Sequence, residues 1–379
     1  MKILHVIVGL NVGGAELMLK RLIESHSGNT NYLHSVISLT DVGKVGEQLQ
    51  ALGVQVQALG MRTSLDTPRV LWQLTRLIRA TQPSIVQSWM YHADLLGGLA
   101  SRLAGNRHVV WGVRTTEVSS GCSRVTNVLR RLCAFLSHWV PHTIVCAAEE
   151  SRKVHVSIGY DSTRMEVVPN GFDMSRLVAT ERQRSGLRAQ LGIQEKEIVI
   201  GSLGRFNPDK DHHNFVQSAG ILADQYSALR FLMVGRDLDS NNTLLARWIN
   251  ETGHADSFIL LGERSDVPVC LSVMDVFCLH SRTEGFPNVL GEAMAMGVPS
   301  VTTDVGDAAF LLGDSGQVIR KESPKDLADG ILKLLLLNPK ERTMLGKKAK
   351  QRILDHFTLS RACDRFGAIY KNILNRDDI

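Results

Sequence analysis

Short β-branched runs alternate with longer amphipathic stretches along nearly the whole chain, and this alternation is what most constrains the fold. Strands separated by helices of about ten to fifteen residues are typical of βαβ units, which build a parallel sheet. In the first half, the expected helices include residues 15–25, 68–80, 93–104 and 123–137. The expected strands there are residues 3–8, 35–39, 54–58, 85–87, 109–113, 143–146 and 166–168.

The alternation breaks near residue 170, where Pro-Asn-Gly and a polar stretch to about residue 196 indicate a connection between domains. A second series follows, so the sequence predicts two doubly wound α/β domains. We expect an N-terminal domain over residues 1–175, a C-terminal domain over 190–358, and a helix over 359–379 that packs back on the first domain. The strands of the second series are expected at residues 198–203, 230–234, 258–261, 276–279 and 300–302.

The composition excludes several classes of protein. Apolar residues make up 44% of the chain and charged residues 21%, which excludes a disordered, collagen-like or coiled-coil chain. The formal charge of +5 is too small to indicate a nucleic-acid partner. No apolar run approaches the roughly 18 residues of a membrane span, and we expect the N-terminus to form a strand rather than a signal peptide. The six cysteines lack metal-binding spacing, so buried thiols and no metal are expected.

A glycine-rich turn, GLNVGGAE at residues 9–16, follows the first predicted strand. Glycines let a backbone approach a ligand, and the N-terminus of the next helix offers N–H groups and a positive dipole to an anion. The spacing differs from G-x-G-x-x-G, which argues against a nicotinamide enzyme. A strand-to-helix turn also needs glycine for structural reasons, so both explanations stay open.

The second domain begins in a parallel way, with GRFNPDK at residues 204–210 after its first strand. Arg205 and Lys210 therefore lie at the carboxyl end of that strand, where open parallel sheets bind ligands. Arginine offers a planar fork to phosphate oxygens, and lysine offers a mobile point charge. Such loop cations can also be merely solvated.

Two glutamates flank a predicted helix start after the strand at residues 276–279. Pro287 suits the first turn of a helix that runs through Ala295 and ends at Gly297. Glu284 then lies on the preceding loop, where it and the nearby N–H groups can hold sugar hydroxyls and phosphate. Glu292 lies within the helix, where its carboxylate can accept hydrogen bonds from both hydroxyls of a ribose.

These motifs together resemble the retaining glycosyltransferases of the family 4 type, which include bacterial mannosyl-, glucosyl- and N-acetylglucosaminyltransferases and sucrose synthase. The resemblance covers essentially residues 1–375 and implies the GT-B fold, with two Rossmann-like doubly wound domains that face each other across a cleft. Its best-known motif is E-x7-E, here Glu284 and Glu292. The motifs in family order are GLNVGGAE, VPNGFD (168–173), GRFNPDK, EGFPNVLGEAMAMGVP (284–299) and TDVGD (303–307).

The resemblance also implies functional residues. The two cations, Arg205 and Lys210, would hold the leaving diphosphate. Glu284 would hold a hydroxyl of the transferred sugar, and Glu292 would hold the ribose. His92 would face the reacting sugar. The catalytic set that it implies is Arg205, Lys210, Glu284 and His92. The donor-binding set is Gly13, Gly14, Gly285, Phe286, Pro287, Asn288, Val289 and Glu292.

Two positions depart from the family pattern. Asp211 follows Lys210 where the family often has glycine, and it either weakens the positive field or caps the next helix. Phe310 stands fourth after Gly306, where an acidic residue is frequent, so contacts to the donor sugar there are open.

The expected activity is retaining transfer of a hexose or N-acetylhexosamine to a glycan or lipid-linked acceptor in cell-surface polysaccharide biosynthesis. The resemblance favours a UDP-sugar donor, with a GDP-sugar as the alternative, and implies no metal or other cofactor. One alternative is a nucleotide-sugar epimerase of the same fold, although no cluster of acids and histidines supports it. Another is a non-catalytic, membrane-associated scaffold, against which the intact motifs argue.

Residues 123–139 form a basic amphipathic segment. Arg124, Arg130, Arg131 and His138 surround one apolar face. Either the helix packs on the core with a solvated edge, or it lies on the inner face of the cytoplasmic membrane, to which a cytoplasmic protein would bind peripherally. The apolar face is formed by Val125, Val128, Leu129, Leu132, Phe135, Leu136 and Trp139.

Overall fold

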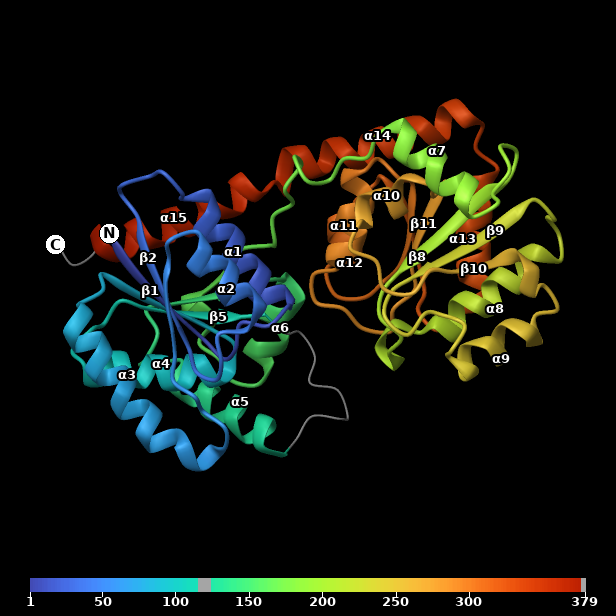
Figure 1. Ribbon diagram of the computed structural model, residues 1–379. Coiled ribbons are helices and arrows are strands. Elements are labelled where there is room, and N and C mark those ends of the chain that lie inside the picture. Colours follow the sequence, from blue (N-terminus) through green and yellow to red (C-terminus); the bar gives the residue numbers. More distant parts are fainter. Residues whose placement is uncertain (115–123, 376–379) are drawn as a thin grey trace. The chain divides into compact units, whose positions relative to one another are not determined.

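The computed structural model describes residues 1–114 and 124–375 (Figure 1). The chain divides into two compact units. The first unit comprises Met1–Gly171 and the C-terminal segment from Leu359 onward, and the second comprises Phe172–Thr358. Each unit is built on one parallel β-sheet, so the prediction of two doubly wound α/β domains is confirmed.

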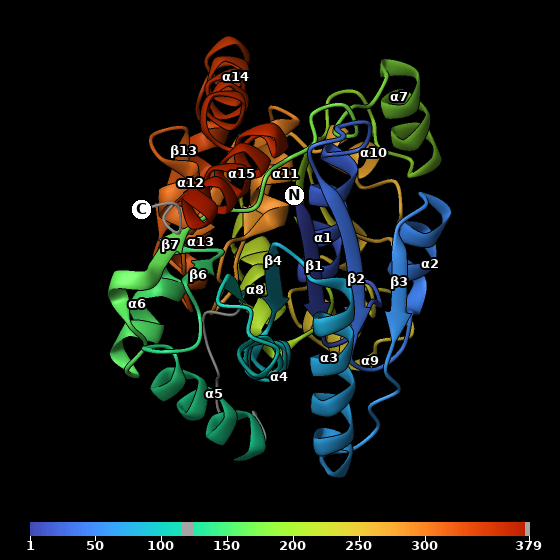
Figure 2. The ribbon, with the colours of Figure 1, turned by 90° about the vertical axis from the view of Figure 1, so that its left-hand side faces the viewer.

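The sheet of the first unit has seven strands in the order β3-β2-β1-β4-β5-β6-β7, all parallel (Figures 1 and 2). The direction in which strands are added reverses between β1 and β4, and ligands bind at such a switch point in open α/β sheets. The strands are β1 Lys2–Ile7, β2 Leu33–Ser38, β3 Gln55–Ala58, β4 Ile85–Trp89, β5 Val109–Val113, β6 Thr143–Cys146 and β7 Met165–Val167.

Helices cover both faces of this sheet. One apolar cluster joins the sheet to α1, α2 and α15, and another joins its opposite face to α3 and α4. The C-terminal helix α15 belongs to this unit because Phe366, Tyr370 and Ile373 are buried against the sheet and α1. The helices are α1 Gly14–Ser25, α2 Gly43–Ala51, α3 Thr67–Thr81, α4 Tyr91–Leu103, α5 Arg124–Leu136, α6 Glu149–Ser157 and α15 Leu359–Asn375.

The second unit has a six-stranded parallel sheet in the order β10-β9-β8-β11-β12-β13. Its strands are β8 Ile198–Leu203, β9 Leu229–Val234, β10 Phe258–Leu260, β11 Val276–Leu279, β12 Ser300–Thr303 and β13 Gly316–Ile319. The helices are α7 Glu181–Gln190, α8 His212–Ala223, α9 Thr243–Glu251, α10 Val267–Ser272, α11 Asn288–Ala295, α12 Ala308–Leu312, α13 Pro324–Leu335 and α14 Pro339–His356.

The polar stretch that we expected to connect the domains contains a helix, α7. Thr180 begins α7 with a capping box, in which its side chain and that of Gln183 each accept a hydrogen bond from the other residue's backbone N–H. Leu187 is buried, and the Arg188 guanidinium donates to the carbonyls of residues 194, 197 and 273. The helix therefore packs on the second unit, which begins at Phe172.

Asp94, in the first turn of α4, is a buried carboxyl group beneath the carboxyl edge of the first sheet. Its Oδ1 accepts hydrogen bonds from Ser88 Oγ at 2.6 Å and from the Gly112 backbone N–H at 3.1 Å. Within the described part of the chain, no donor reaches Oδ2. Burial raises the pKa of Asp94 to about 7, although both hydrogen bonds and the charge of Arg114 act in the opposite direction.

This shift predicts a pH-dependent stability. The unfolded carboxyl group has a pKa of 3.8, so the folded state holds the extra proton between about pH 4 and 7. Uptake of this proton stabilises the folded state fully below about pH 4. As the pH rises from about 4 to 7, the free energy of unfolding falls by about 1.4 kcal/mol per pH unit. Asp94→Asn should therefore unfold at a higher urea concentration than the wild type at pH 8, and the difference should vanish towards pH 4. An equal difference at both pH values would contradict this assignment.

Candidate functional site

Three loops at the carboxyl end of the second sheet form one connected edge, because they follow the neighbouring strands β8, β11 and β12. The Arg282 backbone N–H donates to the Asp209 carbonyl at 2.8 Å, which joins the first two loops. The Thr303 hydroxyl donates to the Ser281 carbonyl at 2.8 Å, and the Asp307 N–H donates to the Gly285 carbonyl at 2.9 Å. These bonds hold the loops that carry the predicted cations and the loop glutamate.

Lys210 and Glu284, both predicted catalytic residues, form an ion pair at this edge. Lys210 Nζ lies 2.5 Å from Glu284 Oε1, and only 24% and 11% of the two side chains are exposed. Ser281 Oγ donates to the same carboxylate oxygen at 2.6 Å. Sequence reasoning missed Ser281, although its place two residues after the end of β11 could have indicated it.

Arg205 lies on the same loop and is exposed. No ion pair of its guanidinium is found among residues 1–114 and 124–375. The loop passes close to the neighbouring strand, because a Cβ on Gly235 (φ +150°) would lie 2.0 Å from the Gly204 carbonyl oxygen. Of the two predicted catalytic cations, Lys210 is thus paired and Arg205 is exposed.

Asp211 does not cap α8 with its side chain, which was one of the two roles that we expected. Its φ is +52°, a left-handed conformation that glycine adopts freely and that aspartate tolerates. It precedes α8, but its side chain does not cap that helix. Instead Oδ1 lies 3.1 Å from the Arg282 guanidinium, so the negative charge is neutralised locally.

Gly306, in the TDVGD motif, shapes the loop that carries Glu284. Its φ is +52°, and a Cβ there would lie 2.3 Å from the Glu284 carbonyl oxygen and 2.5 Å from that of Gly285. Any side chain would push these two backbones apart. Glycine is therefore required both for the conformation and for the close approach.

The helix after Glu284 begins one residue later than predicted. α11 starts at Asn288 with Pro287 in the N-cap position, and Gly297 follows its end with a φ of +76°. Gly291 packs against Phe172, because a Cβ would lie 2.0 Å from the ring. Of the predicted donor-binding residues here, Phe286 and Pro287 are buried, whereas Gly285, Asn288, Val289 and Glu292 are half-buried.

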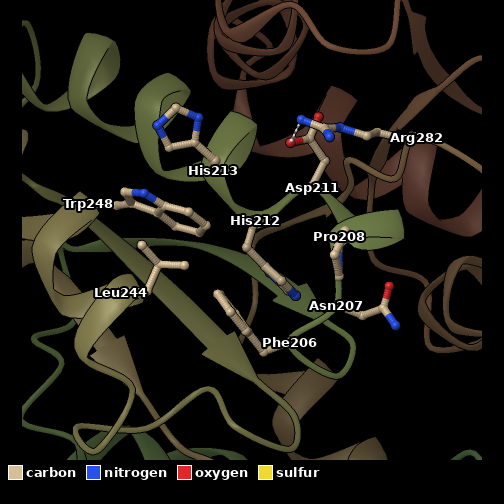
Figure 3. A pocket seen from close by; sticks show the side chains of 9 residues that line it. All are labelled: Phe206, Asn207, Pro208, Asp211, His212, His213, Leu244, Trp248 and Arg282. Carbon is tan, nitrogen blue, oxygen red and sulfur yellow. Dashed lines mark ion pairs between the residues drawn. The ribbon is translucent and has the colours of Figure 1, made fainter. Parts of the chain in front are cut away.

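A cavity of about 360 Å³ lies on another side of the loop after β8, between the starts of α8 and α9 (Figure 3). None of the predicted site residues lines it. The side chains that line this cavity anchor the loop instead. The Phe206 ring stacks on the His212 ring with centroids 5.6 Å apart, and its centroid lies 5.6 Å from that of the Trp248 ring. The lining residues are Phe206, Asn207, Pro208, Asp211, His212, His213, Leu244, Trp248 and Arg282.

The remaining predicted residues lie in the first unit, after the neighbouring strands β1 and β4. Gly13 is the N-cap of α1 and has an extended backbone, and Gly14 begins the helix on an exposed turn. His92 lies in the first turn of α4 and is half-buried. Burial lowers the pKa of His92, so its ring is neutral at pH 7. The structure thus places Gly13, Gly14 and His92 at the switch point of this sheet.

The cysteines and the acidic and histidine residues form no metal site in the described residues, where no group of three or more potential ligands gathers. Five cysteines are buried free thiols, as expected: Cys133, Cys146, Cys270, Cys278 and Cys363. Cys122 lies outside the described residues.

Two family profiles match the chain. The profile described as Glycosyltransferase Family 4 matches residues 12–176, and the profile described as Glycosyl transferases group 1 matches residues 183–352. The chain belongs to this family of glycosyltransferases. The enzyme class that the motifs implied is therefore confirmed, whereas the roles of individual residues stay predictions.

Similar proteins agree with this assignment. A galactosyltransferase from Escherichia coli, named UDP-Gal:alpha-D-GlcNAc-diphosphoundecaprenol alpha-1,3-galactosyltransferase, is 22% identical over 79% of this chain and 78% of its own. The capsular polysaccharide biosynthesis glycosyltransferase CapM of Staphylococcus aureus is 24% identical over 81% and 82%. The crystal structure of Anabaena Alr3699/HepE in complex with UDP superposes with a TM-score of 0.86 at 20% identity, covering 98% of this chain and 100% of that one. The structural likeness supports the GT-B fold.

Proposed function

We propose that this glycosyltransferase moves a hexose or N-acetylhexosamine, with retention, from a UDP-sugar to a glycan or lipid-linked acceptor in cell-surface polysaccharide assembly. The observation that carries the proposal is the Lys210–Glu284 pair beside the exposed Arg205 at the carboxyl edge of the second sheet. The relatives support the substrate class, since one is named for a diphosphoundecaprenol acceptor and one solved structure holds UDP.

The donor diphosphate binds at this edge through the two cations. The Lys210 ammonium has three donors, so it can keep its hydrogen bond to Glu284 and still donate to phosphate oxygens. The Arg205 guanidinium gives a second, planar set of donors. Glu284 retains lone pairs for a hydroxyl of the transferred sugar, and Glu292 accepts from the ribose hydroxyls.

In the proposed retaining transfer, the acceptor oxygen attacks the anomeric carbon on the same face of the sugar from which the diphosphate departs. The bond from the anomeric carbon to the phosphate oxygen breaks as the bond to the acceptor oxygen forms. A donor phosphate oxygen takes the acceptor proton, so the products are the glycoside and the nucleoside diphosphate. Arg205 and Lys210 stabilise the charge that develops on the leaving group. The first unit binds the acceptor, and the neutral His92 faces the reacting sugar without adding positive charge there.

Removing either cation should slow turnover strongly. Lys210→Ala and Arg205→Ala should each lower the rate about 10²–10³-fold, by analogy with the loss of a donor that stabilises a developing anion. Release of nucleoside diphosphate from a panel of sugar nucleotides, with lipid-linked acceptors present, measures this. Arg247→Ala is the matched control, because Arg247 is an exposed arginine on α9 that pairs with Glu251.

The same panel separates the alternatives. An epimerase would convert the sugar nucleotide into its epimer with no net release of nucleoside diphosphate. A scaffold would neither convert the sugar nucleotide nor release nucleoside diphosphate. Full turnover in both cation variants would contradict the mechanism, and wild-type protein without turnover on any donor would contradict the activity.

A second proposal concerns the amphipathic segment, of which residue 123 lies outside the described residues. The apolar face of α5 was predicted as a single face. The sheet covers only one edge of it, so one part is buried and the other part is exposed. Leu129, Cys133 and Leu136 pack against the first unit. The remaining five residues form an outward row, exposed by 42–67%: Val125, Val128, Leu132, Phe135 and Trp139.

We propose that this outward row lies in the interface of an anionic membrane, on the cytoplasmic side. The Phe135 and Trp139 rings lie 4.8 Å apart at the end of α5, and the exposed Arg131 lies on the same helix. Apolar side chains beside basic residues are typical of helices that lie in a membrane interface. Among the described residues, none of the helices has the length and apolar character needed to cross a bilayer.

Vesicle binding tests this proposal. A Val128→Ser/Phe135→Ser/Trp139→Ser variant should lose sedimentation with phosphatidylglycerol vesicles, because the buried apolar area would be gone. The control replaces three exposed apolar residues of the second unit, as Val178→Ser/Leu336→Ser/Met344→Ser, and should bind as the wild type does. Binding should fall with salt, since charge attraction is screened. Equal binding by both triple variants would contradict the membrane contact.

A further inference from the structure

Two buried histidines hold the backbone carbonyls of the two predicted cationic residues. His280 Nδ1 lies 2.5 Å from the Lys210 carbonyl oxygen, and His212 Nε2 lies 3.0 Å from the Arg205 carbonyl oxygen. Each histidine is only 3% exposed. The loop between Arg205 and Lys210 is therefore fixed near both ends by an imidazole.

The partners determine the tautomer of each ring. A carbonyl oxygen can only accept, so His280 must carry its proton on Nδ1 and His212 on Nε2. His280 Nε2 then accepts from Ser202 Oγ at 2.6 Å. Burial keeps both rings neutral, since it lowers the pKa of His212 to about 4 and that of His280 well below its usual value.

The rings are also held by aromatic packing. His280 stacks on Phe215 with centroids 5.0 Å apart and meets His212 edge-on at 5.1 Å. His212 in turn stacks on Phe206, as Figure 3 shows at the wall of the cavity. This row of rings joins the end of β11, the start of α8 and the loop after β8. The hydrogen bonds to the loop therefore come from groups that have little freedom to move.

We propose that His280 and His212 are positioning residues that fix the backbone of the Arg205–Lys210 loop, so that its two cations meet the donor diphosphate in the reactive geometry. The proposal rests on the proposed function of that loop. Transition-state stabilisation needs donors that are already in place, and a displacement of about 1 Å can cost roughly 10²-fold in rate.

Substitution by Asn or by Gln distinguishes the roles of the two ring nitrogens of each histidine. The Asn amide nitrogen lies near the place of Nδ1, and the Gln amide nitrogen lies near the place of Nε2. His280→Asn and His212→Gln keep the donor to the loop carbonyl, whereas His280→Gln and His212→Asn lose it. We expect the second pair to lower kcat about ten- to a hundredfold with little change in the acceptor KM, and the first pair to stay within about threefold of the wild type.

The opposite order at the two positions is the decisive outcome. A role in stability alone would lower the unfolding midpoints of the His280→Gln and His212→Asn variants but leave kcat of the folded enzyme unchanged. The same loss for Asn and Gln at each position, or no loss with either, would overturn the proposal. A second measurement applies if a variant folds poorly: in a Lys210→Ala background His280→Gln should cause little further loss, whereas independent effects would multiply.

The test also separates this proposal from the proposed function. If no sugar nucleotide turns over in the wild type, the function fails, and the histidines are then tested through binding of UDP and uridine by calorimetry. His280→Gln and His212→Asn should weaken UDP about tenfold and leave uridine unchanged, and an equal effect on both ligands would overturn the positioning role.

Discussion

The contact between Lys210 and Glu284 is the interaction on which the candidate site depends. It joins two loops whose residues lie 74 positions apart in the chain, and it gives each largely buried charge a partner without which its burial would cost several kcal/mol. Asp211 and Arg282 compensate each other nearby. Arg205 lies exposed beside these pairs, and no ion pair of its guanidinium is found among the described residues, so it can donate to an anionic ligand.

The position of this ion pair depends in turn on the backbone of the two loops, which uncharged groups hold in place. Gly306 lets the loop after β12 lie directly on the carbonyl groups of Glu284 and Gly285. The aromatic row through His280 and His212 holds the carbonyls on the other side of the pair. In this chain, glycine and charged residues thus act together, since Glu284 is carried by a backbone that Gly306 approaches closely.

Much of this could be predicted from the sequence, because parallel strands end at a common edge. Both motifs were predicted to follow strands, and the structure brings the loops after β8 and β11 together. The direct pairing of Lys210 with Glu284, and the histidine contacts beneath it, could not be predicted, since residues about 70 positions apart carry no local signal. β13 and α7 were missed because the strand is short and half-exposed and the helix is polar. The apolar arc of α5 was treated as one face, although only part of it is buried.

Affinity for the diphosphate group tests the central claim most directly, because it needs neither the acceptor nor the sugar. Calorimetry would compare UDP, UMP and uridine on the wild type and on an Arg205→Ala/Lys210→Ala variant. We expect the wild type to bind UDP roughly ten- to a hundredfold more tightly than uridine, as two charged hydrogen-bond donors provide. That preference should collapse in the double variant, with uridine binding unchanged. A preference for UDP that survives the loss of both cations would contradict the account.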